Sequence, residues 1–404
     1  MALLSVADAL ALVLADAAPL PAEQTPLTEA CGRVLASDLA ALRTQPPADI
    51  SAMDGYAVRA ADVAKVPAQL AVIGEVAAGR PFDRKIGAGQ AARIFTGGVL
   101  PCGADTVVIQ EATSRDGGLL CVKRPEARGR NVRPVGLDFE AGAVLLARGR
   151  RMTARDLALA AAMNRATVPV HRRPRMAVFA TGDELVSPGT EPSAGQIVAS
   201  NNVALLAAGR QEAAEVSDLG IVADRLDATI AAVRRAREAG ADVLVTSGGA
   251  SVGDYDFIQQ AFAAEGIALS FWKVALRPGR PLMHGRLGAM QVLGLPGNPV
   301  SSFVCTVLFL IPLLRRLAGR TDLTLPLEAA VLGCPLAAND ERADYLRASL
   351  AIGSDGARIA TPFGKQDSSM LAPLAKSDCL VVREPFAMEA PSGAPCAILD
   401  LRFL

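Results

Sequence analysis

Histidine is scarce in this sequence: only His171 and His284 occur among 404 residues. That scarcity argues against a metal site built from histidines and against a hydrolase that relies on a Ser-His-Asp triad. Acid–base chemistry is then expected to fall to carboxylates.

Cysteine occurs without the spacing that a structural role requires. The chain has seven cysteines, an odd number, and no two of them form a Cys-x-x-Cys pair. They are widely spread, at Cys31, Cys102, Cys121, Cys305, Cys334, Cys379 and Cys396. Neither a disulfide framework nor a zinc site is therefore encoded, and the pattern is typical of reduced thiols in the cytoplasm.

An excess of charge of either sign is also missing. Lys plus Arg and Asp plus Glu each number 41, so the net charge is zero. No overall field therefore draws the protein to nucleic acid or to an anionic membrane. Any anionic ligand must be held by a local site.

Long uninterrupted apolar runs are absent too. The most apolar stretch, residues 300–317, contains Pro312 and falls short of the ~20 apolar residues that a bilayer requires. We interpret it as a buried or interface helix. The N-terminus carries Asp8 and Asp16 and no basic region, which argues against a secretory signal. The sequence predicts a cytoplasmic protein that binds neither nucleic acid nor membrane.

The length of the chain and its apolar patterning indicate several domains, roughly two to four. Residues 42–48 and 168–174 are rich in proline and polar residues and are interpreted as connectors, with a mostly β segment between them. After Pro174, short apolar runs alternate with glycine turns and helical patterns, which predicts βαβ units in a parallel sheet. Short β-like runs from about residue 325 onward predict a further β domain.

The most distinctive turn is VTSGGASVGDYD at residues 245–256. The stretch from Ser247 through Gly248 and Gly249 to Ser251 follows an apolar run and precedes a helical pattern, so backbone N–H groups there could cradle a phosphate. An ordinary tight turn is about equally compatible with this pattern. Asp254 and Asp256 favour a Mg²⁺ site beside the phosphate, although aspartate also caps helices.

Two more acids follow other strands of the predicted sheet. Glu184 belongs to the turn TGDE at residues 181–184, and Asp224 follows the apolar run LGIV. Because ligands bind at the carboxyl ends of parallel strands, these acids and Asp256 are expected to form a metal and general-base cluster. The turn LPGNP, with Pro296 and Pro299, ends a third strand and could present rigid backbone to a ligand or simply connect strand to helix.

Basic residues gather in FWKVALRPGRP at residues 271–281. Lys273 and Arg277 would share one face of a strand and could hold a small oxyanion, but a solvated basic edge is the alternative. In the β-rich segment, SAMDGYAV at residues 51–58 contains Asp54-Gly55, a pair typical of hairpin turns.

Seven strings, in this order, resemble the molybdopterin molybdenumtransferase family, to which the E domain of gephyrin also belongs. They span residues 51–302 and read SAMDGYAV, FTGG-x-LP-x-GAD-x-VV, G-x-NVR-x-x-G-x-D, ATGDEL, SGGASVGDYD, FWKVALRPGRP and GLPGNPVSS. The resemblance implies α/β plus β architecture in four domains. These are a molybdopterin-binding α/β domain (2–21 and 173–323), an inserted β-rich lid (42–142), a linker domain (22–41 and 143–172) and a C-terminal β domain (324–404).

The resemblance also assigns roles to individual residues. Positions that the family needs for activity are matched by Asp54, Thr96, Asp138 and Glu184. Its Mg²⁺-handling acids are matched by Asp224 and Asp256, and its rigid loop by Pro296 and Pro299. A basic and hydroxyl pocket for molybdate is matched by Lys273, Arg277, Arg347 and Ser368. Positions 277 and 280 carry arginine where lysine is frequent in bacterial relatives, so a planar guanidinium replaces an ammonium group at the expected anion pocket.

The implied reaction is Mg²⁺-dependent: molybdate enters adenylylated molybdopterin, AMP leaves, and no nucleophilic residue is required. A homodimer is expected, in which Asp54 and Thr96 of one protomer close over the glycine-rich edge of the other. Molybdopterin adenylyltransferase and molybdoenzyme maturation proteins are the further partners that the resemblance suggests.

Two other functions remain open from the sequence. One is the adenylylation of molybdopterin, against which the lid and the C-terminal domain argue. The other is a gephyrin-like scaffold, against which the presence of every acidic position argues.

Overall fold

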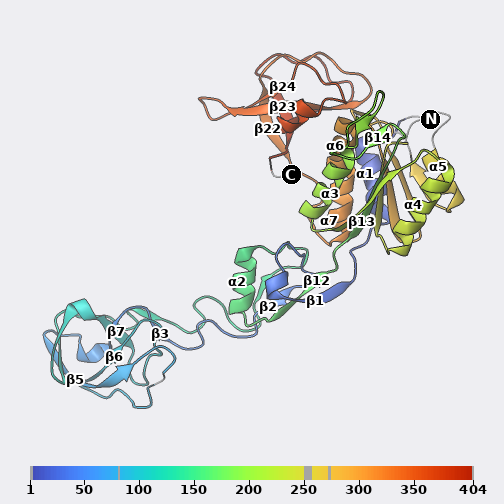
Figure 1. Ribbon diagram of the computed structural model, residues 1–404. Helices are drawn as coiled ribbons and strands as arrows, with labels where there is room; N and C mark the ends of the chain where they lie inside the picture. Colours follow the sequence, from blue (N-terminus) through green and yellow to red (C-terminus); the bar gives the residue numbers. More distant parts are fainter. Residues whose placement is uncertain (1–2, 81, 250–256, 272–273, 403–404) are drawn as a thin grey trace.

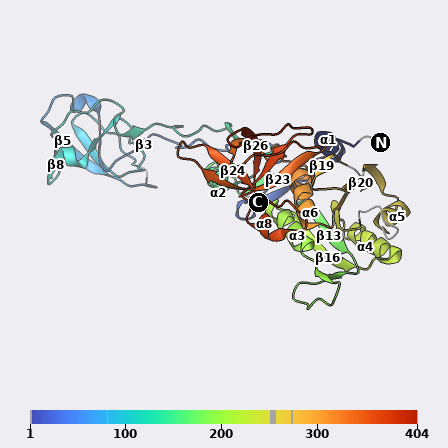
Figure 2. The ribbon, with the colours of Figure 1, turned by 90° about the horizontal axis from the view of Figure 1, so that it is seen from above.

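The computed structural model describes residues 3–80, 82–249, 257–271 and 274–402. The molecule is elongated (Figure 1). A six-stranded β sheet lies at one end, and a small unit of paired strands and one helix lies in the middle. An α/β unit and a second β unit lie together at the other end, an arrangement that the view in Figure 2 also shows.

The α/β unit is built on a six-stranded sheet with the order β16-β13-β17-β21-β20-β18. The first four strands are mutually parallel, and β20 and β18 add to one edge in antiparallel fashion. Their bounds are Glu215–Val222 (β16), Arg175–Thr181 (β13), Val243–Ser247 (β17), Met290–Leu295 (β21), Met283–Leu287 (β20) and Ala268–Phe271 (β18). The parallel sheet expected from the alternation of strand and helix patterns is therefore confirmed.

Helices cover both faces of this sheet. Side chains alternate along each strand, so neighbouring residues contribute to different clusters: Val178 and Val245 pack on one face, whereas Phe179 and Leu244 pack on the other. The first face is covered by α1 (Val6–Ala15), α3 (Asn201–Gln211) and the long helix formed by α6 (Pro299–Cys305), a π-helical turn η4 (Thr306–Leu310) and α7 (Ile311–Leu317). The second is covered by α4 (Leu226–Glu238) and α5 (Phe257–Ala264).

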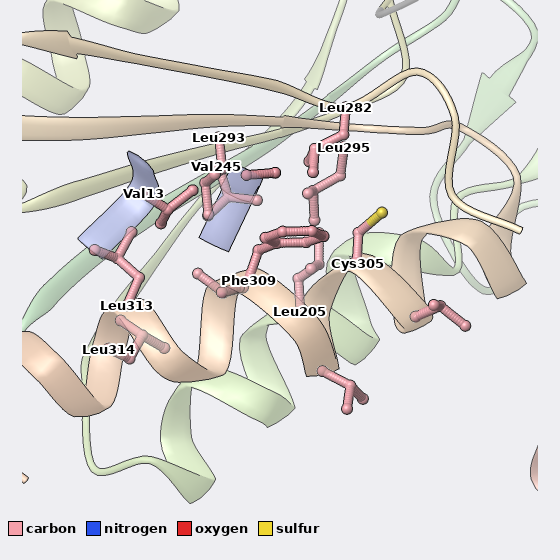
Figure 3. Packing of buried hydrophobic residues seen from close by; sticks show 14 of the residues in the cluster. Val13, Leu205, Val245, Leu282, Leu293, Leu295, Cys305, Phe309, Leu313 and Leu314 are labelled. Atoms are coloured by element: carbon pink, nitrogen blue, oxygen red, sulfur yellow. The ribbon is translucent and has the colours of Figure 1, made fainter. Parts of the chain in front are cut away.

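The long helix forms the centre of the largest hydrophobic cluster (Figure 3). Among the described residues, Pro299–Leu317 is the one helix long and apolar enough to cross a membrane by length and composition, yet 83% of that window is buried inside the protein. The expectation of a buried helix is confirmed. Its π-helical turn comes just before Pro312, which has no amide hydrogen to continue the α-helical pattern.

The middle unit, called the linker unit here, consists of two short ribbons and a helix. Strand β1 (Ala22–Pro26) pairs with β12 (Thr167–His171), β2 (Leu39–Ala40) pairs with β11 (Val144–Leu146), and α2 (Ala154–Ala162) packs beside the 3-10 turn η1 (Leu27–Glu29). The interpretation of residues 168–174 as a connector was therefore wrong for residues 168–171. Val168 and Val170 are fully buried, and the carbonyl of Pro169 accepts a hydrogen bond from the amide of Ala36 at 3.0 Å.

The lid sheet has the order β7-β4-β6-β5-β9-β8. Its strands are Thr106–Ile109 (β7), Gly55–Val58 (β4), Gln90–Ile94 (β6), Ala68–Val76 (β5), Leu119–Val122 (β9) and Thr113–Asp116 (β8), with the 3-10 turns Ala60–Asp62 (η2) and Gln110–Ala112 (η3). Two further strands, Ile50–Ser51 (β3) and Val132–Arg133 (β10), pair beside it.

The hairpin expected at Asp54-Gly55 is not formed. Strand β4 pairs with β6 and β7 rather than with β3. Gly55 serves a different purpose, because a Cβ atom there would lie 2.0 Å from the carbonyl oxygen of Val108. The glycine permits two strands to approach closely.

The C-terminal sheet has the order β19-β23-β24-β22-β26-β25 and is closed by a further pairing of β23 with β25. Its strands are Leu276–Arg277 (β19), Ala343–Ile352 (β23), Arg358–Pro362 (β24), Leu327–Leu332 (β22), Pro395–Asp400 (β26) and Cys379–Arg383 (β25). A short helix, α8 (Leu371–Ala375), precedes β25. Since β19 belongs to the chain segment between β18 and β20, this sheet is joined directly to the α/β unit.

Candidate functional site

Three glycine-containing turns, each of which follows a strand, meet at one edge of the α/β sheet, as the sequence predicted. The carboxyl ends of β13, β17 and β21 lie side by side because these strands are parallel neighbours. They surround a cavity of about 750 Å³. The strand pair β14 (Leu185–Val186) and β15 (Ile197–Val198), the start of α3 and residues of the C-terminal unit complete its wall.

The turn after β17 requires its glycines. Gly248 and Gly249 have φ angles of 92° and 61°, which favour glycine. A Cβ atom on Gly248 would lie 2.6 Å from the carbonyl oxygen of Thr181, and one on Gly249 would lie 2.6 Å from Cγ1 of Ile258. The amide of Gly248 donates to the carbonyl of Leu295 at 3.2 Å, so this N–H holds the turn against β21. Ser247, Gly248 and Gly249 all line the cavity, whereas Ser251 lies outside the described residues.

Asn201 ties two of these turns together. Its Nδ2 atom donates to Oγ of Ser247 at 2.8 Å and to the carbonyl oxygen of Gly297 at 2.8 Å. Pro296 and Pro299 flank Gly297 and also line the cavity, with Pro299 in the first turn of α6. Sequence reasoning missed Asn201; the available signal was Ser-Asn-Asn at the start of a helical pattern.

Carboxylates form the acidic side of the cavity. Glu184 and Asp224 both line it. Asp224 Oδ1 accepts a hydrogen bond from the hydroxyl of Thr181, and the Asp224 amide donates to Oδ1 of Asp183 at 3.0 Å. Asp256 lies outside the described residues, so its expected place beside Asp224 stays a prediction. Within the described ranges, no three acidic, histidine or cysteine side chains converge as a metal-binding group.

The basic residues are distributed differently from the expected anion pocket. Arg280 and Ser369 line the cavity, but Arg277 lines a separate cavity of about 330 Å³ in the C-terminal unit. The guanidinium of Arg277 forms a bidentate pair with Asp344, at 2.7 and 2.6 Å, and this pairing raises the pKa of Arg277. Lys273 lies outside the described residues.

Arg347 is buried and already hydrogen-bonded to the backbone. It is 1% exposed, its guanidinium donates to the carbonyl oxygens of Met370 and Asp367 at 2.8 and 2.9 Å, and burial lowers its pKa. These bonds shape the loop that presents Ser369 to the cavity, while Ser368 accepts a hydrogen bond from the amide of Val300. The structure therefore does not place Arg277, Arg347 and Ser368 on the cavity wall, and their binding of molybdate stays a prediction.

Asp54 and Thr96 form a pair in the lid sheet. Oδ1 of Asp54 accepts hydrogen bonds from the amide and the hydroxyl of Thr96, at 2.8 and 2.9 Å. These bonds, aided by the charge of Arg93, lower the pKa of Asp54. Asp138 is exposed on the segment that returns from the lid sheet, where its amide donates to the carbonyl of Gln45 at 3.0 Å. Within one chain, the lid sheet lies at the opposite end of the molecule from the cavity (Figure 1).

Fold and cavity together define an α/β ligand-binding protein with its site at the carboxyl ends of parallel strands and with two added β units. Comparison with protein families is consistent with this architecture along the whole chain. The MoeA N-terminal region (domain I and II) matches residues 4–164, a probable molybdopterin binding domain matches residues 177–316, and the MoeA C-terminal region (domain IV) matches residues 329–401. The chain belongs to the MoeA, or molybdopterin molybdenumtransferase, family.

Individual relatives are similar over almost their full length. A molybdopterin molybdenumtransferase of Nostoc is 37% identical over 93% of this chain and 88% of its own, and that of Haemophilus influenzae is 34% identical over 91% and 90%. A crystal structure of the molybdopterin biosynthesis MoeA protein from Pyrococcus horikoshii superposes with a TM-score of 0.86, at 30% identity, and covers both chains completely.

Proposed function

We propose that this protein is a molybdopterin molybdenumtransferase that inserts molybdate into adenylylated molybdopterin and releases AMP. The observation that carries the proposal is the cavity at the ends of β13, β17 and β21, with carboxylates on one side and Arg280 on another. A site of this kind can hold a ligand that carries phosphate groups and receives an oxyanion. The names of the relatives supply the reaction class.

The phosphate-bearing part of the substrate is assigned to the glycine-rich turn. Gly248 and Gly249 line the cavity, and because they lack side chains the turn packs closely against Thr181 and Ile258 while its backbone borders the cavity. Asn201 and Ser247 keep this turn at a fixed distance from the turn at Gly297. The substrate would therefore meet a preformed surface, which lowers the entropic cost of orienting it.

Mg²⁺ is assigned to the acidic side of the cavity. The oxygen donors of Asp224 and Glu184 suit this hard cation, which proteins commonly bind through one or two carboxylates while substrate phosphates and water supply the remaining ligands. When bound there, Mg²⁺ would neutralise the charge of the pyrophosphate that links the pterin to AMP. Thr181 orients Asp224 through its hydroxyl, and Asp256 is proposed as a second acid.

Molybdate is the second substrate and is assigned to the basic side. Arg280 and Ser369 line the cavity there. Arg277 and Lys273 are retained as contributors, although Arg277 must exchange its bonds with Asp344 for bonds to the anion.

Asp54 and Thr96 are proposed to complete the site from a second copy of the chain. Their distance from the cavity within one protomer is what a shared cleft in a homodimer would require (Figure 1). We propose that the dimer works in the cytoplasm, since all seven cysteines are free thiols.

The test is an assay of purified protein with adenylylated molybdopterin, molybdate and Mg²⁺. We expect AMP release that requires all three components, together with cofactor that activates a molybdenum-free nitrate reductase. A parallel reaction with MgATP and metal-free molybdopterin should give no adenylylation. Adenylylation without molybdate-dependent AMP release would instead assign the neighbouring activity.

A further inference from the structure

We propose that Arg93 is the positioning residue of the lid, which holds Asp54 in its working orientation by tying together the ends of β4 and β6. Asp54 immediately precedes β4, and Thr96 follows shortly after β6. The inference rests on the proposed function, because it takes Asp54 to be a group that acts at the cleft.

Two aromatic rings hold the side chain of Arg93. Its Cζ atom lies 5.1 Å from the centroid of the Tyr56 ring and 4.9 Å from that of the Phe95 ring. Tyr56 faces Arg93 across the pairing of β4 with β6, and Phe95 directly precedes Thr96. A planar guanidinium suits contacts with aromatic rings in a way that an ammonium group does not.

The same guanidinium is hydrogen-bonded to two residues that adjoin Asp54, one in sequence and one through a backbone hydrogen bond. Nη1 donates to the carbonyl oxygen of Gly55 at 3.3 Å, and Nη2 donates to Oε1 of Gln110 at 2.7 Å. The amide of Gln110 in turn donates to the carbonyl oxygen of Asp54 at 3.1 Å. Arg93 therefore restrains the backbone of Asp54 and Gly55, and with it the position of the Asp54 carboxylate.

The carboxylate itself bonds to Thr96, on the other strand end. The distance between Asp54 and Thr96 depends on how the start of β4 is held against the end of β6. Arg93 contacts Gly55, which follows Asp54, and Phe95, which precedes Thr96. Loss of Arg93 would leave the carboxylate present but loosely held, and a displacement of about 1 Å is enough to cost on the order of 100-fold in rate.

A second arginine of the lid offers a matched control. The Cζ atom of Arg84 lies 5.3 Å from the centroid of the Phe82 ring, so it makes the same kind of aromatic contact. It is exposed and belongs to the segment between β5 and β6 rather than to the ends that carry Asp54 and Thr96.

The experiment compares full-length Arg93→Gln, Arg93→Lys and Arg84→Gln proteins. Arg93→Gln should lower kcat for AMP release about 10- to 100-fold while KM for adenylylated molybdopterin changes less than about twofold. Arg93→Lys should recover less than half of the loss, since lysine keeps the charge but not the planar fork. Arg84→Gln should match the unaltered protein.

A spectroscopic readout separates this inference from the proposed function. In protein labelled with ¹⁵N-threonine, the Thr96 amide signal reports its hydrogen bond to Asp54, and it should shift in Arg93→Gln but not in Arg84→Gln. An unshifted signal with unchanged kcat, equal losses in both glutamine variants, or full recovery by lysine would overturn the role of Arg93. If Asp54→Asn proved fully active while the Thr96 signal still depended on Arg93, the proposed role of Asp54 would fail and the positioning would stand.

Discussion

The cavity and the lid sheet each present an aspartate that accepts a hydrogen bond from a threonine hydroxyl, yet the two pairs have opposite surroundings. At the cavity, Thr181 donates to Asp224, and two more acids, Asp183 and Glu184, follow Thr181 in the same turn. In the lid, Thr96 donates to Asp54 through both its hydroxyl and its amide, and Arg93 lies close by.

This difference indicates different uses for the same chemical group. Several carboxylates gathered in one place offer oxygen ligands to a hard cation, as at Asp224. A carboxylate supplied with two hydrogen bonds and an arginine stays ionised and oriented without a metal, as at Asp54. We therefore propose the cavity as the half of the site that would bind the metal, and the lid as the half that supplies an oriented acceptor.

The largest expected effect comes from mixing the two halves. Asp54→Ala and Asp224→Ala proteins should each be inactive, but when they are unfolded together and refolded at equal concentration, about a quarter of all clefts should recover activity. The reason is that half of the dimers are mixed, and each mixed dimer has one cleft without either lesion. Mixed dimers are verified with differently tagged chains. No recovery in verified mixed dimers would mean that each cleft is built within one chain.

A second prediction separates the two aspartates by their response to Mg²⁺. Asp224→Asn should raise the Mg²⁺ concentration for half-maximal activity at least about tenfold, because an amide is a poorer ligand than a carboxylate. Asp54→Asn should lower activity at every Mg²⁺ concentration without moving that midpoint. Asp227→Asn is the control, since Asp227 is exposed on α4 and pairs with Arg225. An unchanged midpoint in Asp224→Asn would remove Asp224 from the metal site.

A third prediction concerns pH. The hydrogen bonds from Thr96 lower the pKa of Asp54, so Asp54 stays ionised below its ordinary pKa of 3.8. The stabilising effect of this pair is present above 3.8 and is lost as the pH falls through the lowered value. Thr96→Val should move the carboxyl titration of Asp54 upward, as measured by NMR, whereas Thr181→Val should leave it in place. Valine keeps the backbone amide that also donates to Asp54, so a titration that did not move would show that the Thr96 hydroxyl has no part in it.

The smallest effect is expected at Arg277. Arg277→Ala should raise the molybdate concentration for half-maximal activity more than it changes the KM for the pterin substrate. It should also lower the free energy of unfolding by about 1–2 kcal/mol, because Asp344, which is only 4% exposed, loses its bidentate partner. The loss stays small because the Arg277 side chain is 44% exposed and solvent screens the pair. Arg342→Ala serves as a control near Asp340. If the half-maximal molybdate concentration and the KM for the pterin substrate rose equally, Arg277 would not be a molybdate-binding residue.

The sequence predicted the parts of this molecule that depend on local patterns. Apolar periodicity located the parallel strands and helices of the α/β unit, and glycine and proline marked the turns after β13, β17 and β21 that form the cavity. These features depend on neighbours in sequence, so they can be read without coordinates.

Contacts between distant segments could not be read in the same way. Arg277 pairs with Asp344 across β19 and β23 of one sheet, although the two residues are 67 positions apart in the chain, and the bonds of Arg347 go to backbone carbonyls that no side-chain pattern marks. Asn201 likewise bridges Ser247 and Gly297, two turns that become neighbours only once the sheet has formed. Local periodicity contains no information about contacts between residues that are distant in sequence.

The insertion of the lid has a consequence for the order of folding. In the linker unit, Ala22 of β1 pairs with His171 of β12, and the whole lid lies between them in sequence. The chain enters and leaves the lid side by side, since the amide of Gln45 donates to the carbonyl of Phe139 at 2.8 Å. Pairing β1 with β12 closes a long loop, which costs conformational entropy. Folding of the lid brings the two ends of that loop together, so most of this entropic cost has been met before β1 and β12 pair. The lid should therefore fold before the linker ribbon, and a destabilised lid should delay the pairing of strands that it never touches.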